Sequence, residues 1–313
     1  MILDIVAVVA GLSLLTYAAD WLVAGAVGLA YRMGVSALFI GLTVVAFGTS
    51  MPEVVVSVQA SFEGKPGIAV GNVVGSNIFN AAMILGLAAL IRPIACNRAV
   101  VRRDVPVMIL TSGLCWWMAV DQTLSRLEAL VLLGILVVYI AVSYHLGKQE
   151  AVPDIPEEAQ KTEPTTLAQD LGWLVAGLIG LVAGSKLLLY GAVNLAKAFG
   201  LSDEIIGLTL IAAGTSLPEL ATSVVAAWKG QPEIAVGNVV GSNIFNILGI
   251  LGIAGSLLPL SVSDQMLGID IPVMVVVSLG CLPIMHTGMR IVRAEGVLLL
   301  GSFLVYMYSL LQR

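Results

Sequence analysis

Long runs of apolar residues dominate this chain, and short polar stretches separate them. The hydropathy pattern and the positions of Gly and Pro define ten apolar segments. They cover residues 2–31, 36–61, 67–91, 104–120, 125–146, 171–199, 204–228, 234–260, 266–286 and 291–311. A run of about 20 apolar residues can cross a bilayer as a helix. The pattern therefore predicts an all-α integral membrane protein with ten transmembrane helices.

One polar stretch is longer than the others and divides the chain. Residues 147–170 are polar and acidic and contain three prolines, a composition typical of a linker. Five predicted helices lie on each side of it. We therefore expect a first five-helix repeat over residues 1–146, a linker over 147–170 and a second five-helix repeat over 171–313.

The two halves share a duplicated sequence. Residues 41–80 and 207–246 align without a gap and match at 27 of 40 positions. Gly41 is thus equivalent to Gly207, and the same numbering difference relates equivalent residues throughout the two halves. Because five is an odd number of helices, the second half must enter the membrane from the opposite side. The halves are therefore expected to be inverted repeats, related by a pseudo-two-fold axis in the membrane plane, as in several transporter folds.

Composition and charge agree with a membrane protein and give no sign of nucleic-acid binding. The chain is 58% hydrophobic and 11% charged, whereas soluble domains are about 25% charged. It has no basic tract that would bind nucleic acid. Ten loop lysines and arginines lie on the side of the linker and four on the other side. The positive-inside rule then predicts a multi-pass protein of the cell membrane, with a cytoplasmic linker and both termini outside.

One motif in the duplicated region places a carboxylate in each apolar run. The motif Gly-Thr-Ser-x-Pro-Glu ends at Glu53 in the first half and at Glu219 in the second. Both glutamates fall near the middle of their segments, and so near the midplane of the membrane. An ionisable group at that depth is costly, which marks a functional site. Its duplication points to one site at the junction of two repeats.

The same motif is expected to break its helix. Pro52 and Pro218 lack an N–H and clash with the carbonyl four residues earlier, so we expect discontinuous helices at the midplane. Such a break would free backbone carbonyls around residues 46–49 and 212–215. Carbonyl, hydroxyl and carboxylate oxygens would then converge, and hard cations such as Ca²⁺ and Na⁺ prefer these ligands. A proline kink alone would not explain a buried glutamate in both halves.

A second motif, Gly-Asn-x-x-Gly-Ser-Asn-x-x-Asn, begins at Gly71 and again at Gly237. Its two glycines lie four residues apart, a spacing that allows a neighbouring helix to approach closely. Its polar residues form a stripe beside that face. Four of them are expected to be ion ligands: Ser76, Asn80, Ser242 and Asn246. For the others, interhelical hydrogen bonding and ion binding stay open as alternatives: Asn72, Asn77, Asn238 and Asn243.

Charge considerations favour a divalent cation. Glu53 and Glu219 would meet across the pseudo-axis, where two negative charges repel and one would tend to be protonated unless a cation lay between them. Ca²⁺ would neutralise the pair, and so would a few Na⁺ ions assisted by neutral oxygens. A site whose charge can be neutralised either by Ca²⁺ or by a few Na⁺ ions provides a physical basis for exchange. We therefore expect Ca²⁺ and Na⁺ as transported ions, and no prosthetic group.

Two further charges lie within apolar segments at matching repeat positions. Asp20 and Lys186 are equivalent in the repeat alignment and opposite in sign. Inverted repeats place equivalent residues on opposite sides of the midplane, unless the residues lie at the midplane itself. We therefore expect that these two residues do not pair with each other.

Both motifs resemble the alpha-repeats of the cation/calcium antiporter superfamily, and the chain is similar to a prokaryotic sodium/calcium exchanger over all ten predicted helices. The resemblance implies two inverted five-helix halves with four ion sites at the midplane. It implies Ca²⁺ binding by the glutamates and the threonine carbonyls, and further contacts from alanine carbonyls, serine hydroxyls and the last asparagines. The implied ligands are Glu53, Glu219, Thr49, Thr215, Ala46, Ala212, Ser50, Ser216, Ser76, Ser242, Asn80 and Asn246.

The sequence departs from that family pattern at one position. Asn246 stands where the resemblance often implies Asp, so both repeats end in Asn and the centre holds two carboxylates. The coupling ion therefore stays open between Na⁺, H⁺ and K⁺. The linker has no EF-hand spacing, and we expect no obligatory protein partner beyond the lipid bilayer.

The function predicted from the sequence is a secondary antiporter that exports Ca²⁺ against a Na⁺ gradient, rather than an enzyme. By resemblance, segments 2–31 and 171–199 would move against the other eight. One rival is an intramembrane hydrolase using Ser50 or Ser216, but no histidine lies near the midplane to act as its base. A second rival is a passive channel. The two duplicated half-sites are more typical of an exchanger than of a channel.

Overall fold

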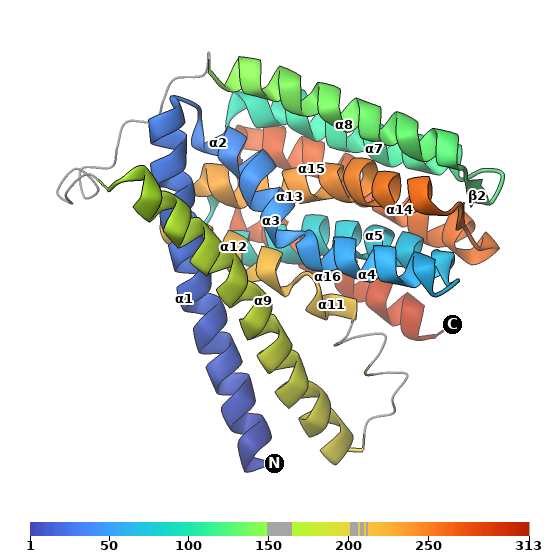
Figure 1. Cartoon of the computed structure of the whole chain (residues 1–313), viewed down its shortest axis with the longest axis horizontal. Coiled ribbons are helices and arrows are strands. Elements are labelled where there is room, and N and C mark those ends of the chain that lie inside the picture. The colour runs from blue at the N-terminus through green and yellow to red at the C-terminus, as the bar shows by residue number, and fades with distance from the viewer. Residues whose placement is uncertain (149–164, 201–205, 207–209, 211, 313) are drawn as a thin grey trace.

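Helices form almost all of the structure, which is a computed structural model that describes residues 1–148, 165–200, 206, 210 and 212–312 (Figure 1). The greater part of the predicted linker and the start of predicted segment 204–228 lie outside these residues. The first half comprises α1 (Ile2–Met33), α2 (Ala37–Ile40), η1 (Gly41–Val45), α3 (Ala46–Thr49), α4 (Met51–Phe62), α5 (Pro66–Ile78), η2 (Phe79–Ile84), α6 (Leu85–Ile91), β1 (Ile94–Ala95), η3 (Val100–Asp104), α7 (Val105–Met118), β2 (Thr123–Leu124) and α8 (Arg126–Gly147).

The described part of the second half follows the same order from the broken helix onwards, with an additional turn, Thr287–Met289, before its last strand. It comprises α9 (Leu167–Ala198), α11 (Ala212–Gly214), α12 (Leu217–Trp228), α13 (Pro232–Phe245), η5 (Asn246–Leu251), α14 (Gly252–Leu257), β3 (Leu260–Ser261), η6 (Met266–Asp270), α15 (Ile271–His286), η7 (Thr287–Met289), β4 (Arg290–Ile291) and α16 (Arg293–Leu311). The η elements are π-helical turns except η7, which is a 3₁₀ turn. Helix α9 begins within the predicted linker, where Thr166 caps it by accepting a hydrogen bond from Gln169 N.

The long apolar helices confirm an all-α membrane protein. Seven continuous helices in the described residues are long and apolar enough to span a bilayer, and one bent pair makes an eighth candidate. The bent pair joins Ala37–Thr49 to Met51–Phe62 at 45°. Predicted segment 104–120 forms the shorter α7, and 204–228 is described only in part. The total of ten therefore stays a prediction.

Two small sheets display the inverted duplication. Strand β1 pairs with β4 and β2 pairs with β3, both antiparallel. In the alignment that equates Gly41 with Gly207, β1 corresponds to β3, and β2 corresponds to β4 to within one position. Each sheet therefore joins one strand from each half, and the second sheet is the repeat image of the first.

Helices α1 and α9 run side by side as an antiparallel pair that leans across the other helices (Figure 1). Each contains 32 residues. At one end Asn194 Nδ2 donates to Asp4 Oδ1 at 3.1 Å, and at the other end Arg32 Nε donates to Asp170 Oδ2 at 2.5 Å. The pair is thus fastened at both ends by polar contacts.

Glycines let the two backbones approach closely between those ends. A Cβ on Gly177 would lie 2.7 Å from Leu22 N and 2.8 Å from Ala18 O, and one on Gly184 would lie 3.0 Å from Leu15 N. Atoms of the backbone cannot move aside as a flexible side chain can. Small residues allow this packing in membranes, where no hydrophobic effect drives helices together. We therefore regard α1 and α9 as one rigid unit.

We expect Gly177→Ala to destabilise the protein, because its Cβ would push against the backbone of α1. Overpacking of this kind costs roughly 1–3 kcal/mol, so the midpoint of thermal unfolding in detergent should fall by several degrees. The matched control is Gly172→Ala on the same helix, where a Cβ meets no atom of the described residues within 4 Å. Equal midpoints for the two variants would contradict the close packing.

Candidate functional site

Both Gly-Thr-Ser-x-Pro-Glu motifs break their helices as predicted. In the first half α3 ends at Thr49, Ser50 adopts φ −81° and ψ 5°, and α4 starts at Met51 with proline in its first turn. In the second half α12 starts in the same way after Ser216, at φ −88° and ψ 9°. Proline suits the first turn of a helix because its missing N–H has no partner there. Each motif thus ends one half-helix and starts another.

The break places each glutamate in the first turn of a half-helix. Glu53 lies in the first turn of α4 and Glu219 in that of α12, and neither side chain is exposed. The N-terminus of a helix carries unpaired N–H groups and a partial positive charge, which favour a carboxylate. This local field offsets part of the cost of burying the two side chains.

Crossed hydrogen bonds join the two motifs into one site. Ser50 Oγ donates to Glu219 Oε1 at 2.8 Å, and Ser216 Oγ donates to Glu53 Oε1 at 2.9 Å. Each serine therefore binds the glutamate of the other repeat. Ser216 Oγ also lies 3.2 Å from Ser76 Oγ, which brings in the second motif.

The terminal asparagines of the second motif lie on π-helical turns beside these helices. Asn80 is in η2, which packs against α12, and Asn246 is in η5, which packs against α4. The wide π turn was not expected from the sequence, which predicted a regular helix there. Single π turns often occur at functional sites. The π turn that carries the asparagine of each repeat thus packs against the glutamate helix of the other repeat.

Several buried oxygens of the site have no hydrogen-bond partner among the described residues. They are Glu53 Oε2, Glu219 Oε2, Thr215 Oγ1, Ser242 Oγ, Asn80 Oδ1 and Asn246 Oδ1. All six belong to residues that the sequence analysis named as ligands. Buried polar atoms without partners are rare and costly, and oxygens of these kinds are the ligands that hard cations accept. Among the described residues, no three or more His, Cys, Asp and Glu lie close enough together to hold a metal ion, so a cation site here would combine two carboxylates with neutral oxygens.

The Ala46 carbonyl, an expected ion ligand, is already hydrogen-bonded in the structure. The Ala46 carbonyl accepts from the Ser50 N–H at 3.0 Å and from the Thr49 hydroxyl at 3.3 Å. The expectation that the break frees this carbonyl is therefore wrong, because the last turn of α3 stays hydrogen-bonded up to Ser50. Its repeat equivalent, Ala212, starts α11 next to residues outside the described part of the chain.

The first asparagine of the second motif has an interhelical structural role in both repeats. It donates to the backbone carbonyl of the glutamate and to a serine one turn later. The bonds are Asn72 Nδ2 to Glu53 O (3.2 Å) and Ser57 Oγ (3.0 Å), and Asn238 Nδ2 to Glu219 O (3.3 Å) and Ser223 Oγ (2.9 Å). Ser57 and Ser223 were not predicted from the sequence, although the two repeats have serine at this equivalent position. Both serines are buried in the structure.

A second asparagine pair joins the halves across the pseudo-axis. Asn77 Nδ2 donates to the Asn243 carbonyl at 3.1 Å, and Asn243 Nδ2 donates to the Asn77 carbonyl at 3.2 Å. Asn246 Nδ2 also donates to Asn77 Oδ1 at 3.0 Å. The interhelical role that had been open for these asparagines is therefore observed.

The pseudo-two-fold symmetry of these bonds is not complete, even where the two sequences are identical. The image of the bond from Asn246 to Asn77 would run from Asn80 Nδ2 to Asn243 Oδ1. Both of these atoms lack a partner in the described residues. Identical residues can therefore occupy different local states in the two repeats.

The glycine prediction for the second motif holds in one repeat. A Cβ on Gly241 would lie 2.4 Å from Leu42 O, and one on Gly237 would lie 3.0 Å from Leu38 O, so η1 packs directly on α13. A Cβ on Gly75 would meet nothing within 4 Å in the described part of the structure. The repeat equivalent of η1 falls at residues 207–211, which are mostly outside that part.

The chain matches known proteins over both halves. The profile of the family described as sodium/calcium exchanger protein matches residues 3–145 and 170–312. The putative antiporter CaxA of Alkalimonas amylolytica is 42% identical over 317 residues, covering 99% of this chain and 99% of the relative. The sodium/calcium exchanger MaX1 of Methanosarcina acetivorans is 35% identical over 336 residues and covers 96% of both chains.

Solved structures give the same result. A structure of the sodium-calcium exchanger NCX_Mj, soaked with zero Na⁺ and Ca²⁺, superposes with a TM-score of 0.85 at 34% identity and covers 99% of both chains. The likeness confirms the inverted-repeat architecture of a multi-pass membrane protein. The matching family consists of transporters rather than enzymes. The chain belongs to the sodium/calcium exchanger protein family.

Proposed function

We propose that this protein is a secondary active antiporter that exchanges Ca²⁺ for Na⁺ by alternating access, with its ion sites between the two repeats. The observation that carries the proposal is the pair of buried glutamates. Each has one oxygen bonded to a serine of the other repeat, while its second oxygen has no partner in the described residues. Two such oxygens are an incomplete coordination shell for a hard cation.

The charge and chemistry of the ligand set favour these two ions. Two carboxylates balance one Ca²⁺, and hydroxyl and amide oxygens complete a shell without adding charge. Na⁺ accepts the same oxygen ligands, so a set of Na⁺ ions competes for them. The proposed ligands are Glu53, Glu219, Thr49, Thr215, Ser50, Ser216, Ser76, Ser242, Asn80, Asn246, Ala46 and Ala212. To bind an ion, the Ala46 carbonyl would release one of the two hydrogen bonds that it accepts.

The relatives support Na⁺ as the coupling ion. MaX1 and NCX_Mj are both described as sodium/calcium exchangers. In this chain Asn80 and Asn246 are neutral, so the two glutamates alone provide the formal charge of the proposed site. We further propose that the linker is cytoplasmic and that both termini lie outside, as the loop charges predict.

We predict that Glu53→Gln and Glu219→Gln each reduce Na⁺-gradient-driven uptake of radiolabelled Ca²⁺ into proteoliposomes to background. Glutamine keeps the volume and can still accept a hydrogen bond from serine, but it removes half of the charge that balances Ca²⁺. The control is Asp121→Asn, an exposed carboxylate in a turn, which should transport as the unmodified protein does. Normal uptake in both glutamine variants would refute the proposed ligands.

The coupling ion is tested by changing only the counter-ion. Ca²⁺ uptake should require an outward Na⁺ gradient and should fall at least tenfold when K⁺ replaces Na⁺ on both sides. A pH gradient without Na⁺ should not restore it. Uptake driven by the pH gradient or by K⁺ would replace Na⁺ in the proposal, and Ca²⁺ flux without any counter-ion would indicate a channel.

A further inference from the structure

An ion pair connects α1 to the end of the helix that carries Glu219. Lys229 Nζ, at the C-terminal cap of α12, pairs with Asp20 Oδ1 in α1. The side chains are 42% and 37% exposed, respectively. As expected from the sequence, Asp20 does not pair with Lys186. It pairs instead across the boundary between the α1–α9 unit and the other helices.

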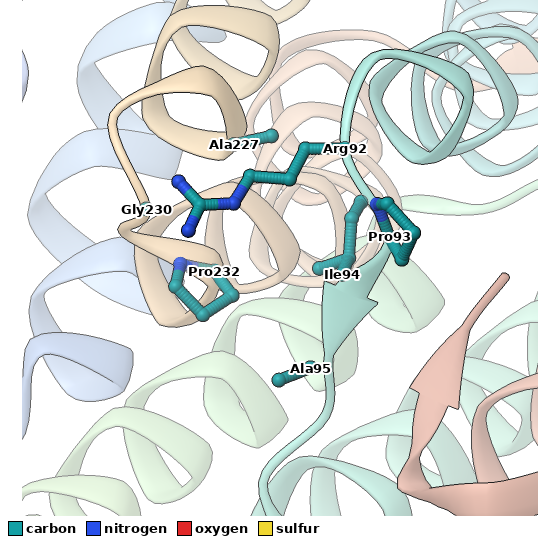
Figure 2. A pocket seen from close by; sticks show the side chains of 7 residues that line it. All are labelled: Arg92, Pro93, Ile94, Ala95, Ala227, Gly230 and Pro232. Atoms are coloured by element: carbon teal, nitrogen blue, oxygen red, sulfur yellow. The ribbon is translucent and has the colours of Figure 1, made fainter. Parts of the chain in front are cut away.

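The end of α12 belongs to the body of the protein rather than to the α1–α9 unit. Arg92, which follows α6, donates from its guanidinium to the Trp228 carbonyl at 3.2 Å. Figure 2 shows the Arg92 side chain extended over the turn at Gly230, with Ala227 and Pro232 beside it. Gly230 has a φ of 74°, and a Cβ there would lie 2.8 Å from this guanidinium. Lys229 is therefore held on the body, and its bond to Asp20 spans two parts of the molecule.

The duplicated sequence contains a second pair of the same kind with its charges exchanged. In the repeat alignment, Asp20 corresponds to Lys186 and Glu63 corresponds to Lys229. A change of sign at only one of these positions would place like charges opposite each other. Because both positions change, the repeat image of Asp20–Lys229 is an attractive pair, Lys186 with Glu63.

That second pair is not formed in this structure. Glu63 accepts a hydrogen bond from Gln59 Nε2 at 2.8 Å and pairs with Lys65 at 3.3 Å. The Gln59 amide, followed by Lys65, lowers the pKa of Glu63, so this carboxylate is charged at neutral pH. Lys186 is exposed on α9 and has no ion pair with the described residues.

Helix packing shows the same asymmetry. Helix α1 packs along α12, whereas the repeat-equivalent helices α9 and α4 make little contact with each other. The glycine packing makes α1 and α9 one unit, so they move together. A shift of this unit that separates α1 from α12 would bring α9 towards α4.

We propose that Asp20–Lys229 and Lys186–Glu63 are alternative ion pairs, each stabilising one of two opposite positions of the α1–α9 unit. The inference rests on the proposed exchange function, because those positions are its two access states. The inverted repeats place the two pairs on opposite sides of the membrane. The four residues are positioning residues, since none of them contributes to the ion site. Both pairs are exposed and therefore weak, so they bias the two states without locking either.

The first test is cysteine cross-linking in the full-length protein. Asp20→Cys with Lys229→Cys should be joined in the state described here by a short bifunctional thiosulfonate reagent, which replaces the length of the removed side chains. Lys186→Cys with Glu63→Cys should also be joined, and either cross-link should block exchange until it is reduced. The native Cys96, Cys115 and Cys281 are buried, so they compete little. Cross-linking at 20–229 but never at 186–63 would overturn the proposal.

The second test asks whether each pair shifts the balance between states. In the 186–63 cysteine background, Asp20→Asn should increase the rate of cross-linking about two- to fivefold, the effect of losing one exposed ion pair. In the 20–229 background, Glu63→Gln should increase that cross-linking rate by a similar factor. Asp121→Asn, the matched control, should change neither rate.

A merely structural role would give a different pattern. Exchanging the charges within one pair, Asp20→Lys with Lys229→Asp, should return the 186–63 cross-linking rate to that of its background, because the attraction is restored. A rate that stays raised in this double variant would indicate loosening of the fold and would refute alternative pairing. Cross-links are scored on gels without any transport. Their failure therefore leaves the proposed Ca²⁺/Na⁺ exchange standing, and absence of Ca²⁺ uptake in the unmodified protein leaves the cross-linking result intact.

Discussion

The burial of two glutamates inside an apolar bundle is the constraint on which the rest of this structure depends. A carboxylate out of water costs several kcal/mol unless hydrogen bonds and opposite charge compensate it. Here one oxygen of each glutamate is satisfied by a serine of the other repeat. Neither half of the chain can therefore build the site alone, which explains why the two broken helices must meet.

Other features of the fold serve this meeting. The proline breaks place Glu53 and Glu219 at helix N-termini, where the local field is positive. In both repeats the first asparagine of the Gly-Asn-x-x-Gly-Ser-Asn motif donates a hydrogen bond to the backbone carbonyl of the glutamate and so holds the glutamate helix. The reciprocal bonds of Asn77 and Asn243 then join the two halves. Positions of the glutamates are thus set by a polar framework rather than by apolar packing alone.

Sequence patterns predicted the helix breaks and the meeting of the two glutamates because both have strong local causes. Proline breaks a helix, and a duplicated glutamate inside an apolar run needs a partner from the other repeat. The π turns at Asn80 and Asn246 were not predictable, since inserting one residue into a turn leaves no pattern in the sequence. The engaged Ala46 carbonyl and the Asp20–Lys229 pair were missed for another reason. The Ala46 carbonyl depends on the residue at which the last turn of α3 ends, and the ion pair depends on how distant segments meet in space; hydropathy contains neither.

The relative size of these energies indicates how the proposed exchange would be controlled. An uncompensated buried carboxylate costs several kcal/mol, whereas an exposed pair such as Asp20–Lys229 contributes about 0.2–1 kcal/mol. In the proposed cycle, ion occupancy would therefore decide whether the α1–α9 unit can move, because a movement that buries two uncompensated carboxylates would carry the larger cost. The ion pairs at its edges can set only which position the loaded protein prefers. In the proposed exchanger, obligatory coupling would follow from the depth of the glutamates, and the preferred resting position would follow from the surface ion pairs.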